Sequence, residues 1–118
     1  MADQHKQLPI VGVTMASVVQ AGVDRITFNA TDGRSWEMDH GQDCCEVVEI
    51  EDICGNLEWL VGSPITQADE ESCDAGKGES STWTFYRIGT AKGLVVIRWL
   101  GESNGYYSER VDFTEVRK

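Results

Sequence analysis

The sequence predicts a mainly β fold: a twisted antiparallel sheet or half-barrel of six to seven strands, with one short helix near residues 56–61. Three observations carry this prediction. Apolar and polar residues alternate along several stretches, glycine-containing turns separate these stretches, and one segment has the start and stop signals of a helix. At 118 residues, 41% of them hydrophobic, the chain can fill one core. We therefore expect a single domain over residues 1–118, flexible over 1–8 and with a mobile loop over 73–81.

The clearest signal is a β-hairpin between residues 25 and 40. Residues 10–19 are apolar and β-branched and predict a strand before it. Within the hairpin, Asp32-Gly33 favours a two-residue turn, and apolar side chains alternate with polar ones on both sides of it: Ile26, Phe28, Ala30, Trp36, Met38 and His40. Because His40 shares the parity of Trp36 and Met38, we expect it at the end of a buried row.

The rest of the chain predicts a further strand, a short helix, an acidic loop and a meander. Residues 44–50 have the pattern of a strand. Residues 56–61 have helix signals, because Asn56 can cap the first turn, Gly62 can end it and Pro64 prevents continuation. Residues 66–81 are acidic and rich in Gly and Ser. Three strand-like segments follow, joined by glycine turns and expected as antiparallel neighbours: 82–88, 94–100 and 106–116.

Negative charge is concentrated in the middle third of the chain. The formal net charge is −10, and residues 35–76 contain no Lys or Arg but twelve acids: Glu37, Asp39, Asp43, Glu46, Glu49, Glu51, Asp52, Glu58, Asp69, Glu70, Glu71 and Asp74. Such a field repels phosphate backbones and attracts basic partners or cations over roughly 8 Å at physiological salt. We therefore expect no direct nucleic-acid binding. The alternative is that the acids only keep the protein soluble.

The cysteines and the amino-terminal segment predict a cellular compartment. No apolar run approaches the roughly 18 to 20 residues that span a bilayer, and residues 1–7 lack the hydrophobic segment of a signal peptide. We therefore expect a cytoplasmic protein with no membrane association. In that reducing compartment the four cysteines are expected to be thiols: Cys44, Cys45, Cys54 and Cys73.

The densest polar cluster surrounds His40. Imidazole, thiolate and carboxylate groups bind divalent metals, and the candidate ligands are His40, Asp43, Cys44, Cys45 and Cys54. Adjacent cysteines lack the paired spacing of zinc sites, so the alternative is that Cys44 and His40 are buried core side chains. A Cys–His nucleophile pair is disfavoured, because neighbouring acids stabilise the thiol over the thiolate. The sequence therefore favours a protein without catalysis or cofactor, and a divalent metal stays the open alternative.

A second feature is the turn at Asn104-Gly105, which two tyrosines follow. Because successive strand side chains alternate, one of Tyr106 and Tyr107 is expected to join the core and the other to face outward. An exposed tyrosine is a typical anchor of protein interfaces. The alternative is that both tyrosines only stabilise a hairpin.

With these residues in view, the chain resembles a family of small uncharacterised proteins encoded by bacteriophages and prophages, a domain of unknown function. Two motifs carry most of the resemblance: His40-Gly41-Gln42-Asp43-Cys44-Cys45-Glu46 and Ser103-Asn104-Gly105-Tyr106-Tyr107-Ser108. Segments 50–53, 62–65 and 82–86 add to it. The resemblance implies a phage setting and supplies no mechanism, although small acidic phage proteins often bind and block a host protein.

Three hypotheses follow. The first is a phage-encoded acidic accessory protein that binds and inhibits a host protein with a basic surface, in counter-defence or host takeover. Its expected interaction surface is Asp43, Glu46, Glu49, Glu51, Asp52, Glu58, Asn104, Tyr106 and Tyr107. The second is a metal- or small-ligand-binding domain that uses His40, Asp43 and Cys44. The third is a structural subunit that forms a homo-oligomer through its sheet edge.

Overall fold

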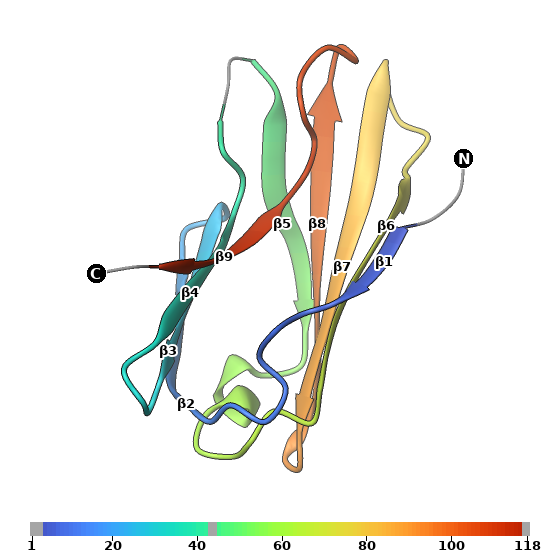
Figure 1. Cartoon of the computed structure of the whole chain (residues 1–118). Helices are drawn as coiled ribbons and strands as arrows, with labels where there is room; N and C mark the ends of the chain where they lie inside the picture. The colour runs from blue at the N-terminus through green and yellow to red at the C-terminus, as the bar shows by residue number, and fades with distance from the viewer. Residues whose placement is uncertain (1–3, 43–44, 117–118) are drawn as a thin grey trace.

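The computed structural model describes residues 4–42 and 45–116, which form nine strands and one 3-10 helix (Figure 1). The elements are β1 (Gln4–Gln7), β2 (Met15–Ala21), β3 (Arg25–Ala30), β4 (Ser35–Asp39), β5 (Val47–Cys54), η1 (Leu57–Leu60), β6 (Gln67–Asp74), β7 (Ser80–Thr90), β8 (Gly93–Ser103) and β9 (Asp112–Val116). All strand pairs are antiparallel, and they build two sheets, ordered β1-β6-β7-β8-β5 and β2-β3-β4-β9. The mainly β prediction is confirmed, with two sheets in place of one curled sheet.

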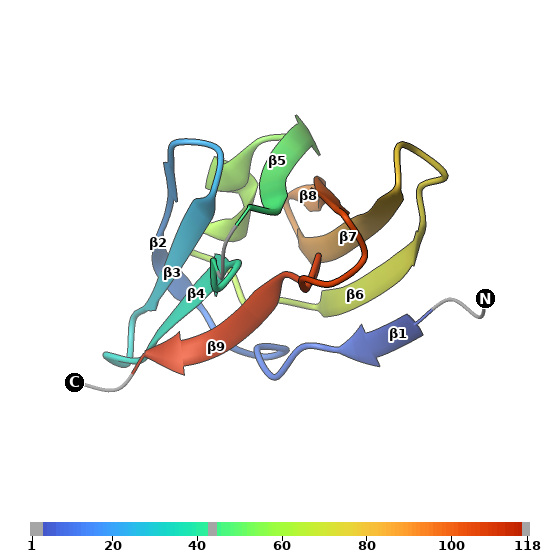
Figure 2. The ribbon, with the colours of Figure 1, turned by 90° about the horizontal axis from the view of Figure 1, so that it is seen from above.

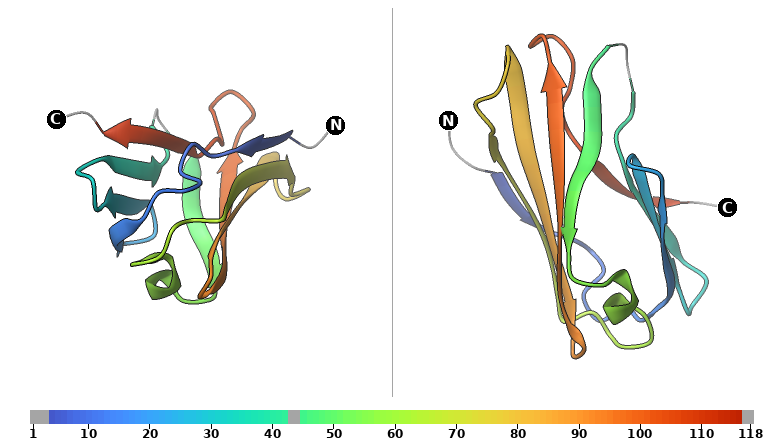
Figure 3. Two further views of the ribbon diagram at one scale, coloured as in Figure 1. Left: turned by 60° about the horizontal axis from the view of Figure 1, so that its bottom comes forward. Right: turned by 180° about the vertical axis from the view of Figure 1, so that it is seen from behind.

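The two sheets face each other and enclose the hydrophobic core (Figures 2 and 3). Trp99 of β8 donates a hydrogen bond from its indole Nε1 to the sulfur of Met38 on β4, across 3.3 Å. Phe113 of β9 packs edge-on against Phe28, with ring centroids 5.5 Å apart, and also meets Tyr86 of β7. Phe28 and Phe113 lie in the same sheet, whereas the contacts of Trp99 with Met38 and of Phe113 with Tyr86 join the two sheets.

The predicted hairpin is present as β3 and β4. Phe28 lies opposite Trp36, and Ile26 lies opposite Met38, so the alternating apolar residues form one buried face. The turn is one residue longer than predicted, because the Ala30 amide bonds the Arg34 carbonyl and leaves residues 31–33 as the loop. Gly33 supplies the positive φ of 93° that a three-residue hairpin loop favours.

Strands also form where the sequence predicted flexibility or a loop. Residues 4–7 form β1, which pairs with β6. The acidic segment 67–74 forms β6, and the expected loop over 73–81 shrinks to the connection between β6 and β7. The sequence of β6 does not show the usual alternation of apolar and polar residues, because the charged residue Glu70 occupies a buried position.

The C-terminal part departs from a simple meander. β7 and β8 form the predicted hairpin, but β9 covers only Asp112–Val116 and pairs with β4 in the other sheet. The connecting residues 104–111 therefore cross from one sheet to the other (Figure 1). The crossing is close, because a Cβ at Gly101 of β8 would meet the Glu109 carbonyl at 2.7 Å. This crossing segment positions the residues described below.

The predicted short helix is the single 3-10 turn η1. The Asn56 side chain accepts a hydrogen bond from the Glu58 amide, at 2.9 Å, as the capping signal predicts. Over the residues that it describes, the structure has no helix with the length and hydrophobicity of a membrane span.

Candidate functional site

The acids of the middle third do not gather on one surface. Apart from Glu46, which directly precedes β5, the described acids are divided among β4 in one sheet, β5 and β6 in the other sheet, and η1. β7 and β8 separate β5 from β6. Residues from outside the segment neutralise part of the charge, since Arg87 pairs with Asp69 at 3.1 Å and with Glu71 at 2.6 Å. The acidic residues that are neighbours in the sequence are therefore spread over different parts of the folded protein.

The most exposed group of acids lies on β5, at the edge of the five-stranded sheet. The register with β8 shifts between Ile50 and Asp52, which makes Glu51 the extra residue of a β-bulge. Because of this shift, Ile50 and Ile53 both pack against the core, while Glu49, Glu51 and Asp52 are all exposed.

One arginine lies near this acidic edge. The Arg98 guanidinium is 3.6 Å from the Glu51 carboxylate and lies 4.9 Å from the Trp83 ring centroid. At the end of β5, η1 adds the exposed Glu58 and Trp59, whose side chain is one of the exposed large hydrophobic groups at 38%. We call Glu49, Glu51, Asp52, Glu58 and Trp59 the β5 surface.

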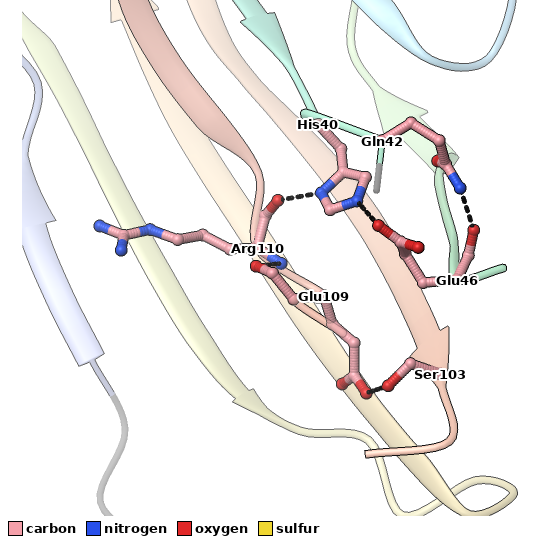
Figure 4. A network of polar contacts seen from close by, with 7 residues as sticks. His40, Gln42, Glu46, Ser103, Glu109 and Arg110 are labelled. Atoms are coloured by element: carbon pink, nitrogen blue, oxygen red, sulfur yellow. Dashed lines mark hydrogen bonds and ion pairs between the residues drawn. The ribbon is translucent and has the colours of Figure 1, made fainter. Parts of the chain in front are cut away.

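Glu46 is not part of any exposed surface. Its carboxylate is fully buried, and its Oε2 forms a hydrogen bond of 2.7 Å with His40 Nε2 (Figure 4). The His40 side chain is also buried, at only 4% exposed. His40 Nδ1 lies 2.6 Å from the Arg110 carbonyl, which can only accept, so Nδ1 is the donor. Gln42 donates from its side-chain amide to the Glu46 carbonyl. The pair therefore connects His40, directly after β4, and Glu46, directly before β5, to the crossing segment.

Electrostatics favour a charged imidazole in this pair. Burial lowers the pKa of His40, but the hydrogen bonds to Glu46 and to the Arg110 carbonyl and the charges of Glu46 and Asp112 outweigh it. The pKa of His40 therefore lies above its usual value of 6.5. His40 is buried at the end of the Trp36 and Met38 row, as parity predicts, and both its ring nitrogens are engaged.

The metal candidates are only partly described. Asp43 and Cys44 lie outside the described residues. Cys45 is disulfide-bonded rather than a thiol, which corrects the expectation for that cysteine, whereas Cys54 and Cys73 are thiols, as expected. The sequence also predicts a strand from residue 44, in which adjacent cysteines would point to opposite faces, but Cys45 lies in a bend and β5 begins at Val47. Over the described residues, no group of three or more His, Cys, Asp or Glu side chains is placed to hold a metal ion.

The tyrosine turn differs from the prediction, because neither tyrosine lies in a strand and Tyr107 is not part of the hydrophobic core. Tyr106 is 89% exposed, whereas Tyr107 is half-buried. The Asn104 side chain accepts from the Tyr106 amide and Ser103 Oγ accepts from the Gly105 amide, which shape the turn. This turn and η1 lie at opposite ends of the five-stranded sheet (Figure 1), so the turn stands apart from the η1 end of the β5 surface.

A pocket of about 400 Å³ opens beneath the crossing segment. Its walls are the inner faces of β6 and β7 and residues 105–111. Along β7 the inner face changes from the buried apolar Ile88 and Tyr86 to Thr84 and Thr82, and along β6 it changes from Ala68 to carboxylate and hydroxyl groups. The inner face is thus apolar over the core and polar at the pocket.

Glu109 anchors the crossing segment in this pocket. Its Oε2 accepts from Ser103 Oγ at 2.5 Å (Figure 4). Its Oε1 accepts from Thr82 Oγ1 at 2.7 Å. Burial raises the pKa of Glu109, but hydrogen bonds from Ser103, Ser80 and Thr82 outweigh it and hold the pKa below its usual value. The carboxylate is therefore ionised at neutral pH.

Sequence reasoning missed this pocket. The signal available was the alternation along 80–90, where serine and threonine take the parity of Tyr86 and Ile88. Polar residues on an inward face mark a place where the core is incomplete. The partner strand and the crossing segment were not identifiable from the sequence, so the cavity between them was not either.

Comparison with known proteins gives a family and no activity. The model of a family described as a domain of unknown function, DUF7448, matches residues 8–113. No curated protein and no solved structure matches the chain. The chain therefore belongs to the DUF7448 family.

Proposed function

We propose that this protein is a binding module that docks through the β5 surface on a basic region of another protein. The observation that carries the proposal is the β-bulge at Glu51, which presents three carboxylates on an edge strand with one arginine nearby. In the phage setting that the resemblance implies, the partner is a host protein in the cytoplasm, and covering its basic region inhibits it.

The chemistry of the β5 surface fits arginine and lysine side chains. Carboxylates accept charge-assisted hydrogen bonds from guanidinium groups, and an exposed tryptophan face attracts cations. Trp59 adds an aromatic anchor of the kind that dominates binding energy in interfaces. The acidic charge accelerates encounter with a basic partner and repels nucleic acid.

The first prediction concerns capture from a host lysate by immobilised protein. Glu49→Gln/Glu51→Gln removes two exposed carboxylates of the β5 surface. Glu79→Gln/Glu115→Gln removes two exposed carboxylates elsewhere and is the matched control. We expect the wild type and the control to retain the same basic protein, identified by mass spectrometry, and the β5 variant to lose it.

Two results would overturn the proposal. One is equal retention of that protein by all three chains, which would make the β5 carboxylates irrelevant. The other is the absence of any protein held by the wild type and the control but not by the β5 variant.

A further inference from the structure

The pocket beneath the crossing segment is a second charged site, separate from the β5 surface. It lies on the inner face of β6 and β7, whereas β5 is the edge strand on the far side of β8. Its volume of about 400 Å³ is within the range of small-ligand pockets, roughly 300–1,000 Å³. Ligand binding in the pocket therefore does not depend on docking through the β5 surface.

One oxygen of a buried carboxylate in this pocket has no hydrogen-bond donor within the described part of the chain. Glu70 of β6 is 9% exposed, and among the described residues its Oε1 atom has no hydrogen-bond partner. The Lys6 ammonium forms a long ion pair with this oxygen at 3.9 Å, which is beyond hydrogen-bond distance. An unsatisfied buried carboxylate oxygen is costly, and a donor from a ligand in the pocket satisfies it.

The charge of the pocket selects the sign of the ligand. Its charged lining consists of three carboxylates, Glu70, Asp74 and Glu109, and one guanidinium, Arg110. The Arg110 side chain is 68% exposed and lies 3.9 Å from Asp112, so it stands at the rim rather than against Glu70. Both Glu109 oxygens are already bonded to hydroxyls. The carboxylates that can still accept from a cation are Glu70 and the exposed Asp74, whose Oδ1 also accepts from the Gly76 amide at 2.7 Å.

The kind of cation follows from the same groups. The described carboxylates are not placed to hold a metal ion. Hydroxyl-bearing residues surround the carboxylates, including Ser72, Thr84 and Tyr107. An elongated organic cation fits this arrangement, because its charged end can reach Glu70 while its stem contacts the tyrosine ring and the threonine methyl groups.

We propose that this pocket binds an organic ammonium or guanidinium group, with Glu70 as its buried acceptor and Asp74 at the opening. The group comes from a free polyamine or from a lysine or arginine side chain of a protein. The Ser103-to-Ser108 turn, a motif without a role in the β5 surface, forms part of the wall through Gly105 and Tyr107.

The test is binding of two probes, spermidine and Nα-acetyl-arginine amide, to the full chain by calorimetry and by NMR shift mapping. We expect saturable binding with shifts in residues 70–74, 82–84 and 105–111, and no binding of inorganic phosphate. Glu70→Gln should weaken binding about tenfold or more, since it removes a charge-assisted acceptor. Glu71→Gln, on the opposite face of the same strand and paired with Arg87, should bind as the wild type does.

Further variants separate folding and docking from cation binding. Should Glu70→Gln fail to fold, Asp74→Asn, at an exposed position, is expected to weaken binding severalfold. Glu49→Gln/Glu51→Gln should leave cation binding unchanged, so loss of β5 docking and loss of the pocket are distinguishable. A tenfold preference for the arginine probe indicates a protein side chain, and the reverse preference indicates a free polyamine.

Three outcomes would overturn the proposal: no saturable binding of either cation, shifts confined to residues 47–59, or equal binding by the wild type and by both the Glu70 and Asp74 variants.

Discussion

His40 and Glu46 form a buried ion pair at the junction of the two sheets. Both His40 nitrogens are engaged, and the Glu46 carboxylate is fully buried. Removing one partner of such a pair leaves an uncompensated buried charge, which typically costs about 3–5 kcal/mol. Replacing both partners by apolar groups costs much less. The pair therefore fixes how the end of β4 and the start of β5 meet the crossing segment.

The second prediction is that this pair stabilises the fold in a pH-dependent way. Because the pKa of His40 is raised in the folded chain, its contribution is fully present below the usual value of 6.5 and is lost as pH rises through the folded pKa. We expect the free energy of unfolding of the wild type, minus that of His40→Phe/Glu46→Leu, to fall from about pH 5.5 to about pH 9. Urea denaturation measures it, and a difference that is constant or grows over this range contradicts the account.

At the scale of elements, the hairpins were predictable and the irregular strands were not. The β3 and β4 hairpin and the β7 and β8 hairpin follow from alternation and turn residues. The bulge at Glu51 was not visible, because an inserted residue breaks the alternation that identifies a strand. β6 was not predicted because acidic residues occupy both of its faces, so apolar and polar residues do not alternate along it. Edge carboxylates on β5 also oppose pairing with a second strand.

The third prediction concerns the crossing of residues 104–111 over β8. A Cβ at Gly101 would meet the Glu109 carbonyl at 2.7 Å and the Glu109 Cβ at 2.8 Å, and backbone atoms cannot move aside cheaply. We expect Gly101→Ala to lower the free energy of unfolding by about 1–3 kcal/mol. Gly41→Ala is the matched control, because a Cβ there meets nothing within 4 Å. Equal stability of the two variants in urea denaturation would show that the crossing is looser than described.

At the scale of the whole molecule, the fold redistributes the charge that the sequence concentrates. Composition predicts one acidic surface, but the acids occupy both sheets, Glu46 and Glu70 are buried, and Arg87 neutralises Asp69 and Glu71. Which strands become neighbours depends on contacts between distant residues, and a charge count along the chain contains no such information. Two acidic sites result: the β5 surface on an outer edge and the Glu70 pocket between β6, β7 and the crossing segment.

The central claim is that exposed β5 carboxylates drive docking, and the salt dependence of association tests it most directly. The association rate constant with the captured basic protein is measured from about 0.05 to about 0.5 M salt for the wild type, Glu49→Gln/Glu51→Gln and Glu79→Gln/Glu115→Gln. The account predicts a steep fall with salt for the wild type and the control and a shallower fall, from a lower starting rate, for the β5 variant. Identical rates and salt slopes for all three chains would contradict it.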